Sequence, residues 1–279
     1  MKICEGIGMI GSVCGDIIGS VFEWHNVKSE DFELFGRESR FTDDTVMTVA
    51  VADKLLCCQN RQGLLYDGTA AKEYAARFRQ YYSRHPHAGF GQMFSGWAKD
   101  DSLKKQRSYG NGGAMRAVPI GYAFDHLEAV LKEAQLSCFY THHHREAVAG
   151  TKAVAGCVFL ARTGGSKEEI RRFVAEKIGY SLNFTLNDIR SEYRFDSRTS
   201  YSVPPAIVAF LESDDYESAI RKAISIGGDS DTIACIAGGI AHAFYGSVPK
   251  PIYDKCMMLL DSGLKKTANE FMTRYGISV

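Results

Sequence analysis

The sequence predicts an all-α protein, a compact orthogonal multi-helix bundle that forms one domain over residues 1–279. Apolar residues recur at three- and four-residue spacing in nearly every long segment, which is the period of an amphipathic helix. No two alternating runs of apolar and polar residues are joined by a short glycine turn, so no β-hairpin is expected. No linker rich in Pro, Gly or Ser divides the chain, and 45% of its residues are hydrophobic, enough for one full core.

The apolar periodicity places the helices. A clean stripe runs from Ile233 to Phe244, and a looser one from Val46 to Cys57. Several further candidates open with Ser, Asp, Thr or Pro, which favour the first turn of a helix. These candidates cover residues 70–82, 127–140, 145–161, 167–178, 205–211, 216–226 and 252–275. Residues 15–19 are expected to form a turn, and residues 195–203 to be irregular or extended.

The composition disfavours nucleic-acid-binding, disulfide-bonded and membrane-spanning proteins. Lys+Arg and Asp+Glu number 33 each, so the chain lacks the broad basic surface with which proteins bind nucleic acid or anionic membranes. The eight cysteines include no CxxC pair and lie mostly in apolar runs, which favours buried thiols in a reducing compartment over a disulfide framework. The apolar N-terminal stretch is interrupted by Glu5 and Asp16 and is too short to span a bilayer. We therefore expect a cytoplasmic monomer with no membrane partner.

Two short clusters of acids and hydroxyls each precede an apolar helix: Thr-Asp-Asp-Thr at residues 42–45 and Asp-Ser-Asp-Thr at residues 229–232. An ordinary helix cap needs one acid, whereas two or three carboxylates against an apolar helix repel one another unless a cation lies among them. Asp and Thr oxygens without Cys or His favour Mg²⁺ or Mn²⁺ over zinc. Helix capping and Ca²⁺ binding remain alternatives, although neither cluster has the spacing of an EF-hand loop.

If the two clusters meet in the fold, they can hold two ions that clamp the hydroxyls of a substrate and polarise a water. Glu23 is a candidate third contributor, although a single acid of this kind is more often a solvated surface residue.

A glycine-rich segment, Ser108 to Arg116, precedes another helical pattern. Backbone N–H groups freed by glycines suit a diphosphate, although a turn that feeds a packed helix has the same composition. The spacing is neither that of a Walker A loop nor that of a dinucleotide fingerprint. Tyr109 is expected either to stack on a base or sugar or to pack in the core. His142 is expected either to hydrogen bond within the site or to cap a helix, and no Cys or Glu-x-x-His partner supports zinc.

Together these motifs resemble the ADP-ribosylglycohydrolase family, which includes dinitrogenase reductase-activating glycohydrolase and the ADP-ribosyl-arginine and ADP-ribosyl-serine hydrolases. The resemblance spans about residue 6 to about residue 246 and implies an all-α fold with a binuclear Mg²⁺ or Mn²⁺ centre at the base of an ADP-ribose cleft. The shared residues, in the family's order, are Gly15-Asp16, Gly19-Ser20, Glu23, Phe41 to Thr45, Ser108 to Arg116, Thr141-His142 and Gly227 to Thr232.

The resemblance also implies roles for individual residues. The metal ligands are Thr42, Asp43, Asp44, Asp229, Asp231 and Thr232. The substrate-binding residues are Ser108, Tyr109, Gly110, Asn111, Gly112 and His142. Glu23 matches an acid on a mobile segment, and either Glu23 or Asp229 accepts a proton in catalysis. The chain departs from bacterial relatives at His143, Arg145, Ser200 and Tyr201, which leaves the released group open.

The implied activity is metal-dependent hydrolysis of the glycosidic bond between ADP-ribose and a modified protein side chain or small conjugate, which releases ADP-ribose. A metal-free glycosidase with two carboxylates is the alternative mechanism. A two-metal phosphoesterase that acts on a nucleotide diphosphate and a non-catalytic ADP-ribose-binding protein are the alternative functions. The presence of every matched acid favours an enzyme over a binding protein.

Overall fold

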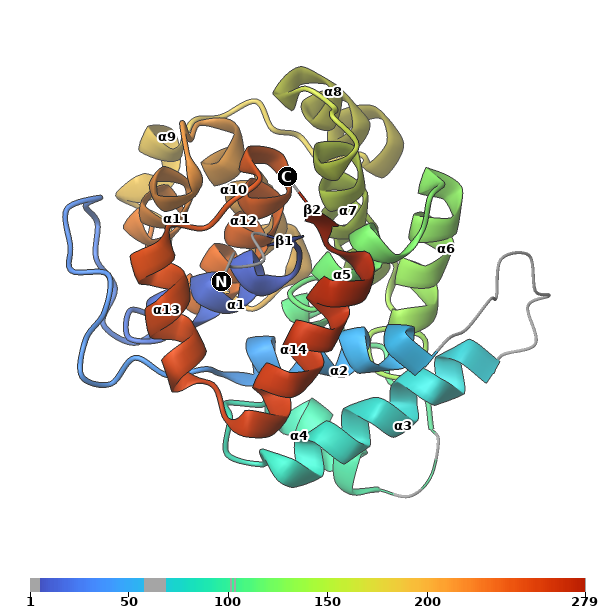
Figure 1. Ribbon diagram of the computed structural model, residues 1–279. Coiled ribbons are helices and arrows are strands. Elements are labelled where there is room, and N and C mark those ends of the chain that lie inside the picture. The colour runs from blue at the N-terminus through green and yellow to red at the C-terminus, as the bar shows by residue number, and fades with distance from the viewer. Residues whose placement is uncertain (1–5, 58–68, 101, 103, 279) are drawn as a thin grey trace.

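A computed structural model describes residues 6–57, 69–100, 102 and 104–278 of the chain. This part is helical, as predicted, apart from one short antiparallel strand pair, β1 (Gly6–Ile7) and β2 (Ile277–Ser278). The pair was not predicted from the sequence. It places Gly6 opposite Ser278, so the first and last described residues lie side by side (Figure 1).

The helices follow one another with short connections. Their bounds are α1 (Ile10–Gly19), α2 (Asp43–Cys57), α3 (Thr69–Arg84), α4 (Gln92–Lys99), the 3₁₀-helix η1 (Asn111–Gly113), α5 (Val118–Ala123), α6 (Leu127–Cys138), α7 (Arg145–Arg162), α8 (Lys167–Arg172), the π-helix η2 (Phe173–Ile178), α9 (Leu186–Arg190), α10 (Thr199–Leu211), α11 (Tyr216–Ser225), α12 (Ser230–Tyr245), α13 (Lys250–Leu259) and α14 (Ser262–Tyr275).

Helices α1 and α12 pack against each other at the centre of the fold, and every residue of α1 is buried. Their backbones meet at glycines spaced four residues apart on α1. A Cβ atom at Gly15 would lie 2.1 Å from the carbonyl oxygen of Ala234, and one at Gly19 would lie 2.5 Å from the Cα of Asp231. Only glycine permits this approach, and the approach brings the acid on α1, Asp16, next to the start of α12.

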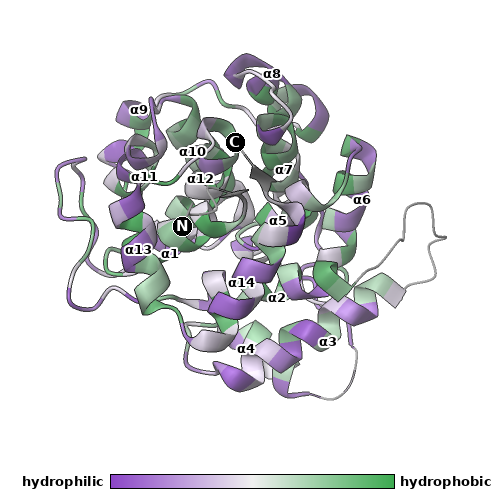
Figure 2. Ribbon diagram, in the orientation of Figure 1, coloured by the Kyte–Doolittle hydropathy of each residue, from purple (hydrophilic) through white to green (hydrophobic). Residues whose placement is uncertain are grey.

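Other helices surround this central pair (Figure 1). Helices α7, α10 and α11 pack against α12, while α2 packs against α1, α3, α5 and α14. Figure 2 shows that peripheral helices such as α8 carry many hydrophilic residues, whereas the interior segments are mainly hydrophobic. Among the described residues, no helix combines the length and the apolar character needed to cross a membrane.

Three expectations about local structure were wrong. Residues 15–19 belong to α1 rather than to a turn, because their glycines serve close packing between helices. Residues 199–203 begin α10 rather than forming an extended segment, and the hydroxyl of Thr199 donates to the carbonyl of Tyr109 at 2.8 Å. Residues 252–275 form two helices, because Asp261 accepts the N–H groups of Gly263 and Leu264 and so starts α14.

The expectation of buried thiols is confirmed for most of the described cysteines. Cys14, Cys138, Cys157, Cys235 and Cys256 are buried free thiols. Cys57, at the end of α2, is exposed, which corrects the expectation at that position. Cys4 and Cys58 lie outside the described residues.

We predict that Gly15→Ala destabilises the protein by about 3 kcal/mol, the upper end of the cost of overpacking, because the new methyl group meets backbone that cannot rotate away. For a chain of this size that change lowers the melting temperature by roughly 6–12 °C, measurable by calorimetry.

Gly96→Ala in α4 is the matched control, since nothing lies within 4 Å of a Cβ atom there. It should raise stability by up to about 1 kcal/mol through helix propensity. Equal effects of the two substitutions would contradict the close contact between α1 and α12.

Candidate functional site

A pocket of about 560 Å³ opens where α2 and α12 begin. Its lining comes from both acid clusters, the segment that follows α1, the glycine-rich loop and the segment before α7. Every site residue predicted from the sequence lines this pocket: Glu23, Thr42, Asp43, Asp44, Ser108, Tyr109, Gly110, Asn111, Gly112, His142, Asp229, Asp231 and Thr232. The structure therefore brings the sequence motifs to one place.

The two acid clusters meet directly. The hydroxyl of Thr232 donates to Oδ2 of Asp44 at 3.3 Å. Carboxylate oxygens of Asp16, Asp44 and Asp231 lie within 4.8 Å of one another, and the same limit holds for a second group formed by Glu23, Asp229 and Asp231. Because Asp231 belongs to both groups, the two groups of oxygens are adjacent, an arrangement suited to two neighbouring cations.

Asp16 is a member of the cluster that was not predicted as a site residue from the sequence. Its fully buried carboxylate accepts hydrogen bonds from the backbone N–H of Thr42 at 2.9 Å, from the Thr42 hydroxyl at 2.6 Å and from the backbone N–H of Thr45 at 3.1 Å. The Thr45 hydroxyl also donates to it. Asp16 thus fixes the start of α2 to α1. The sequence feature that could have identified Asp16 as a site residue is its place in the Gly15-Asp16 motif.

The acids at the start of α12 differ in how they use the helix backbone: Oδ1 of Asp231 accepts the N–H of Thr232 at 2.9 Å, whereas Asp229 does not cap the helix. Asp229 occupies the N-cap position of α12, but its side chain accepts no N–H group of that helix. Its Oδ2 instead accepts a hydrogen bond from Nδ2 of Asn111 at 2.7 Å. Oδ1 of Asp44 is buried and has no hydrogen-bond partner among the described residues. The hydroxyl of Thr42 accepts the N–H of Asp44 at 3.3 Å, so capping accounts for part of the clusters, while the oxygens of Asp44 and Asp229 are left available for a cation.

Burial and mutual repulsion make these acids hard to ionise. Burial is the main reason that the pKa values of Asp16, Asp44 and Asp231 are raised, and nearby carboxylates raise those of Asp44 and Asp231 further. The same two causes raise the pKa of Asp43 to about 8 and that of Glu23 to about 7. Among the described residues, no ion pair joins any of these five acids to a basic side chain. The cluster must therefore retain protons or bind cations at neutral pH.

The segment that carries Glu23 is tied to the turn that carries Asp229. Nδ2 of Asn26 donates to the carbonyl of Glu23 at 3.0 Å and to that of Gly228 at 3.1 Å. Oδ1 of Asn26 accepts the N–H of Gly228 at 2.7 Å. Gly228 has a φ of +78°, a conformation that favours glycine. Asn26 therefore fixes the spacing between two acids of the site, a role that its own sequence context did not indicate.

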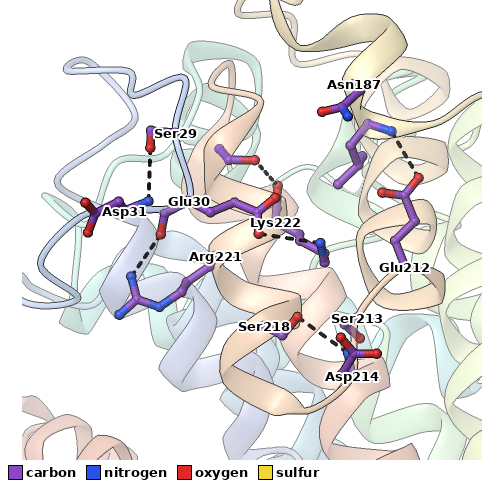
Figure 3. Close-up of polar contacts among 12 residues, drawn as sticks. Ser29, Glu30, Asp31, Asn187, Glu212, Ser213, Asp214, Ser218, Arg221 and Lys222 are labelled. Carbon is purple, nitrogen blue, oxygen red and sulfur yellow. Dashed lines mark hydrogen bonds and ion pairs between the residues drawn. The ribbon is translucent and has the colours of Figure 1, made fainter.

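Further along the same segment, Glu30 joins the chain to α9 and α11. Figure 3 shows its contacts with Arg221 and Lys222 of α11. Its carboxylate lies 3.0 Å from Nη2 of Arg190 and 3.5 Å from Nζ of Lys222. Its carbonyl accepts a hydrogen bond from Nη1 of Arg221 at 3.0 Å. Partly exposed ion pairs contribute only about 0–1 kcal/mol each, so the anchoring depends on several contacts together.

The glycine-rich loop is held on both sides by backbone pairing. Arg107, just before the loop, forms a β-bridge with His142, and Gly110 forms one with Arg198. The pairing joins the loop to the segments that precede α7 and α10. Because both flanks are fixed, the loop is positioned by contacts that are remote in sequence.

Two N–H groups expected to cradle an anion are already used within the protein. The N–H of Gly110 donates to the hydroxyl of Ser108 at 3.1 Å, and that of Asn111 donates to the carbonyl of Ser197 at 2.8 Å. The side chain of Asn111 is directed to Asp229. In this conformation the loop supports the acid cluster, and fewer backbone donors are free for a ligand than the sequence suggested.

Exposed apolar side chains gather at the mouth of the pocket. Trp24, Met93, Tyr109 and Phe195 all line it, and Trp24 is 70% exposed. The rings of Trp24 and Phe195 stack with their centroids 5.4 Å apart. Tyr109 is 53% exposed, so the alternative of a core position was wrong and the ring is available for stacking. The sequence did not single out Trp24 or Met93.

His142 is buried beside the loop and does not cap α7. The cap of that helix is His144, whose Nδ1 accepts the N–H of Glu146 at 3.3 Å. The capping alternative for His142 is therefore wrong, and its ring is left to face the pocket.

Comparisons with known proteins find relatives over most of the chain. ADP-ribosylhydrolase ARH3 of Danio rerio is 28% identical over 314 residues, which cover 86% of this chain and 83% of that protein. Human ARH3 is 27% identical, with 89% and 87% of the two chains covered. ADP-ribosylarginine hydrolase Tri1 of Pseudomonas putida is 25% identical and covers 85% of this chain and 69% of its own.

The fold is shared with a solved structure described as an ADP-ribosylglycohydrolase-related protein complex, with a TM-score of 0.68, 21% identity and 97% of each chain covered. The sequence profile described as ADP-ribosylglycohydrolase matches residues 7–276. Because this match covers nearly the whole sequence, the chain belongs to the ADP-ribosylglycohydrolase family.

Proposed function

We propose that this protein is a metal-dependent ADP-ribosyl glycohydrolase that cleaves the bond between ADP-ribose and a modified protein side chain or a small conjugate. The observation that carries the proposal is the meeting of two acid clusters in one pocket, with no ion pair from a described basic residue to Asp44 or Asp231. The named relatives act on ADP-ribosyl groups, and one of them on ADP-ribosylarginine.

The residues present fit two Mg²⁺ or Mn²⁺ ions. The ligands would be Thr42, Asp43, Asp44, Asp229, Asp231 and Thr232. Their donors are oxygens only, as hard divalent cations prefer, and Oδ1 of Asp44 is buried without a partner among the described residues. When bound, such ions polarise hydroxyl groups and water and stabilise developing negative charge.

The protein's own groups orient the substrate and accept the proton. Either Glu23 or Asp229 would accept the proton of the attacking water. The pKa of Glu23, raised by burial to about 7, suits proton transfer near neutral pH. Asn111 orients Asp229, and Asn26 holds the Glu23 segment beside it. The departing group would take its proton from an acid or from solvent.

The remaining residues of the pocket would bind the ADP-ribosyl group. They are Ser108, Tyr109, Gly110, Asn111, Gly112 and His142. The exposed ring of Tyr109 would stack on the base or a sugar. We further propose that the protein acts as a cytoplasmic monomer with one domain over residues 1–279.

The metal requirement predicts that protein treated with EDTA and then freed of chelator loses turnover of an ADP-ribosyl-arginine or ADP-ribosyl-serine peptide and regains it with Mg²⁺ or Mn²⁺. Asp231→Asn should lower kcat by about 100-fold and weaken metal uptake in calorimetry, because Asp231 belongs to both groups of oxygens.

Asp254→Asn makes the same chemical change on the exposed side of α13 and should leave kcat unchanged. Chromatography of the products separates the possible reactions. Free ADP-ribose is expected, AMP or phosphate would indicate a phosphoesterase, and full activity of the metal-free protein would refute the metal mechanism.

The anchoring of the Glu23 segment predicts that Asn26→Ala lowers kcat by about 10- to 100-fold, because a small displacement of a reacting group is costly. The Kd for ADP-ribose should change little, since Asn26 is absent from the pocket lining. Asn183→Ala is the control, because that side chain is exposed. Unchanged kcat in Asn26→Ala would show that Asn26 does not position Glu23.

A further inference from the structure

We propose that Arg116 and Thr141 fix the ring of His142 in the tautomer that carries its proton on Nε2, so that this N–H donates to an anionic oxygen of the ligand. The oxygen would belong to the diphosphate of ADP-ribose, and to that extent the inference rests on the proposed function. Arg116 and Thr141 are positioning residues, because they act through His142.

Arg116 is a fully buried cation with no ion-pair partner among the described residues. Its Nη2 donates to the carbonyl of Ser137 at 3.0 Å and to the hydroxyl of Thr141 at 2.8 Å. Its guanidinium carbon lies 3.9 Å from the ring centroid of Phe78. A guanidinium group only donates hydrogen bonds, so the Thr141 hydroxyl must accept at this contact.

The proton of the Thr141 hydroxyl then has one acceptor. The hydroxyl oxygen lies 2.9 Å from Nδ1 of His142, and no other described residue accepts a hydrogen bond from it. If Nδ1 carried the proton instead, the hydroxyl proton would be buried without an acceptor, since Thr141 is 1% exposed. Nδ1 therefore accepts, and the proton of the neutral ring is on Nε2.

The surroundings also keep the ring neutral. Burial lowers the pKa of His142 well below its ordinary value, and the positive charge of Arg116 lowers it further. A protonated ring would place two buried cations in contact through one hydroxyl. The ring thus offers one N–H donor and one acceptor, and the acceptor is already used.

Nε2 faces the glycine-rich loop. A Cβ atom at Gly112 would lie 2.9 Å from Nε2, so the absence of a side chain there allows the ring edge to reach the loop. Both residues line the pocket, and no described residue accepts a hydrogen bond from Nε2. The nearby N–H groups of Gly110 and Asn111 donate to protein oxygens. The Nε2–H group is therefore a donor without a protein acceptor, and an anionic oxygen is its complement.

The tautomer can be measured directly by ¹⁵N NMR on the full chain labelled at histidine, without substrate or metal. In the wild-type protein we expect Nε2 of His142 to carry the proton and Nδ1 to accept a hydrogen bond, with the same pattern at pH 8 and pH 6. Thr141→Val removes the hydroxyl at nearly constant volume and should give a mixture of tautomers and weaken ADP-ribose binding about tenfold.

Thr141→Ser retains the hydroxyl and should restore both the single tautomer and the affinity. Thr273→Val, on the exposed end of α14, is the control for the chemical change, and thermal melts verify that each variant folds. Wild-type protein with the proton on Nδ1 would overturn the inference. An unchanged tautomer in Thr141→Val would do the same.

Titration with ligands tests which group the donor recognises. ADP-ribose should shift the Nε2–H proton signal of His142, pyrophosphate should do so more weakly, and adenosine, which has no phosphate, should leave it in place. An equal shift with adenosine would overturn the assignment to phosphate oxygens. The tautomer is measured in the free protein, so this test does not depend on enzymatic activity. If the glycohydrolase proposal alone is wrong, the His142 ring will carry its proton on Nε2 but the protein will show no turnover.

Discussion

The arrangement of the site depends on the contact between α1 and α12, where glycine replaces side chains between two buried helices. Backbone atoms in contact leave no freedom to slide, so the relative height of the two helices is fixed. Asp16 then transmits this position to α2 through its hydrogen bonds to Thr42 and Thr45. Both acid clusters are thus located by one packing contact and one buried carboxylate.

This arrangement is unfavourable for the protein alone. Carboxylates buried near one another raise each other's pKa values, and the bundle supplies no described ion pair to offset the repulsion. Arg116 also lines this pocket, and its buried guanidinium packs against Phe78 and donates to a carbonyl rather than forming an ion pair with a described acid. The pocket thus combines buried acids, which suit cations, with a buried cation that is not paired with them.

Much of this could be predicted from the sequence, because periodicity and clustering are local signals. The stripe from Ile233 to Phe244 predicted α12, and acids without Cys or His predicted a site built from oxygens. Helix α1 was missed because its glycines disfavour a helix in isolation, and its stability comes from burial against α12. The roles of Asn26 and Thr141 could not be predicted, since each depends on a partner brought close only by the fold.

The contact between α1 and α12 also sets the order in which the protein can be assembled. The N–H of Gly11 donates to Nδ1 of His242, across a separation of 231 residues. During synthesis α1 emerges before α12, and although α2 can pack against α1 early, the face of α1 that contacts α12 stays uncovered until α12 leaves the ribosome. The central helix pair therefore closes late, and a nascent chain that lacks α12 has a partly uncovered α1 and only one of the two acid clusters.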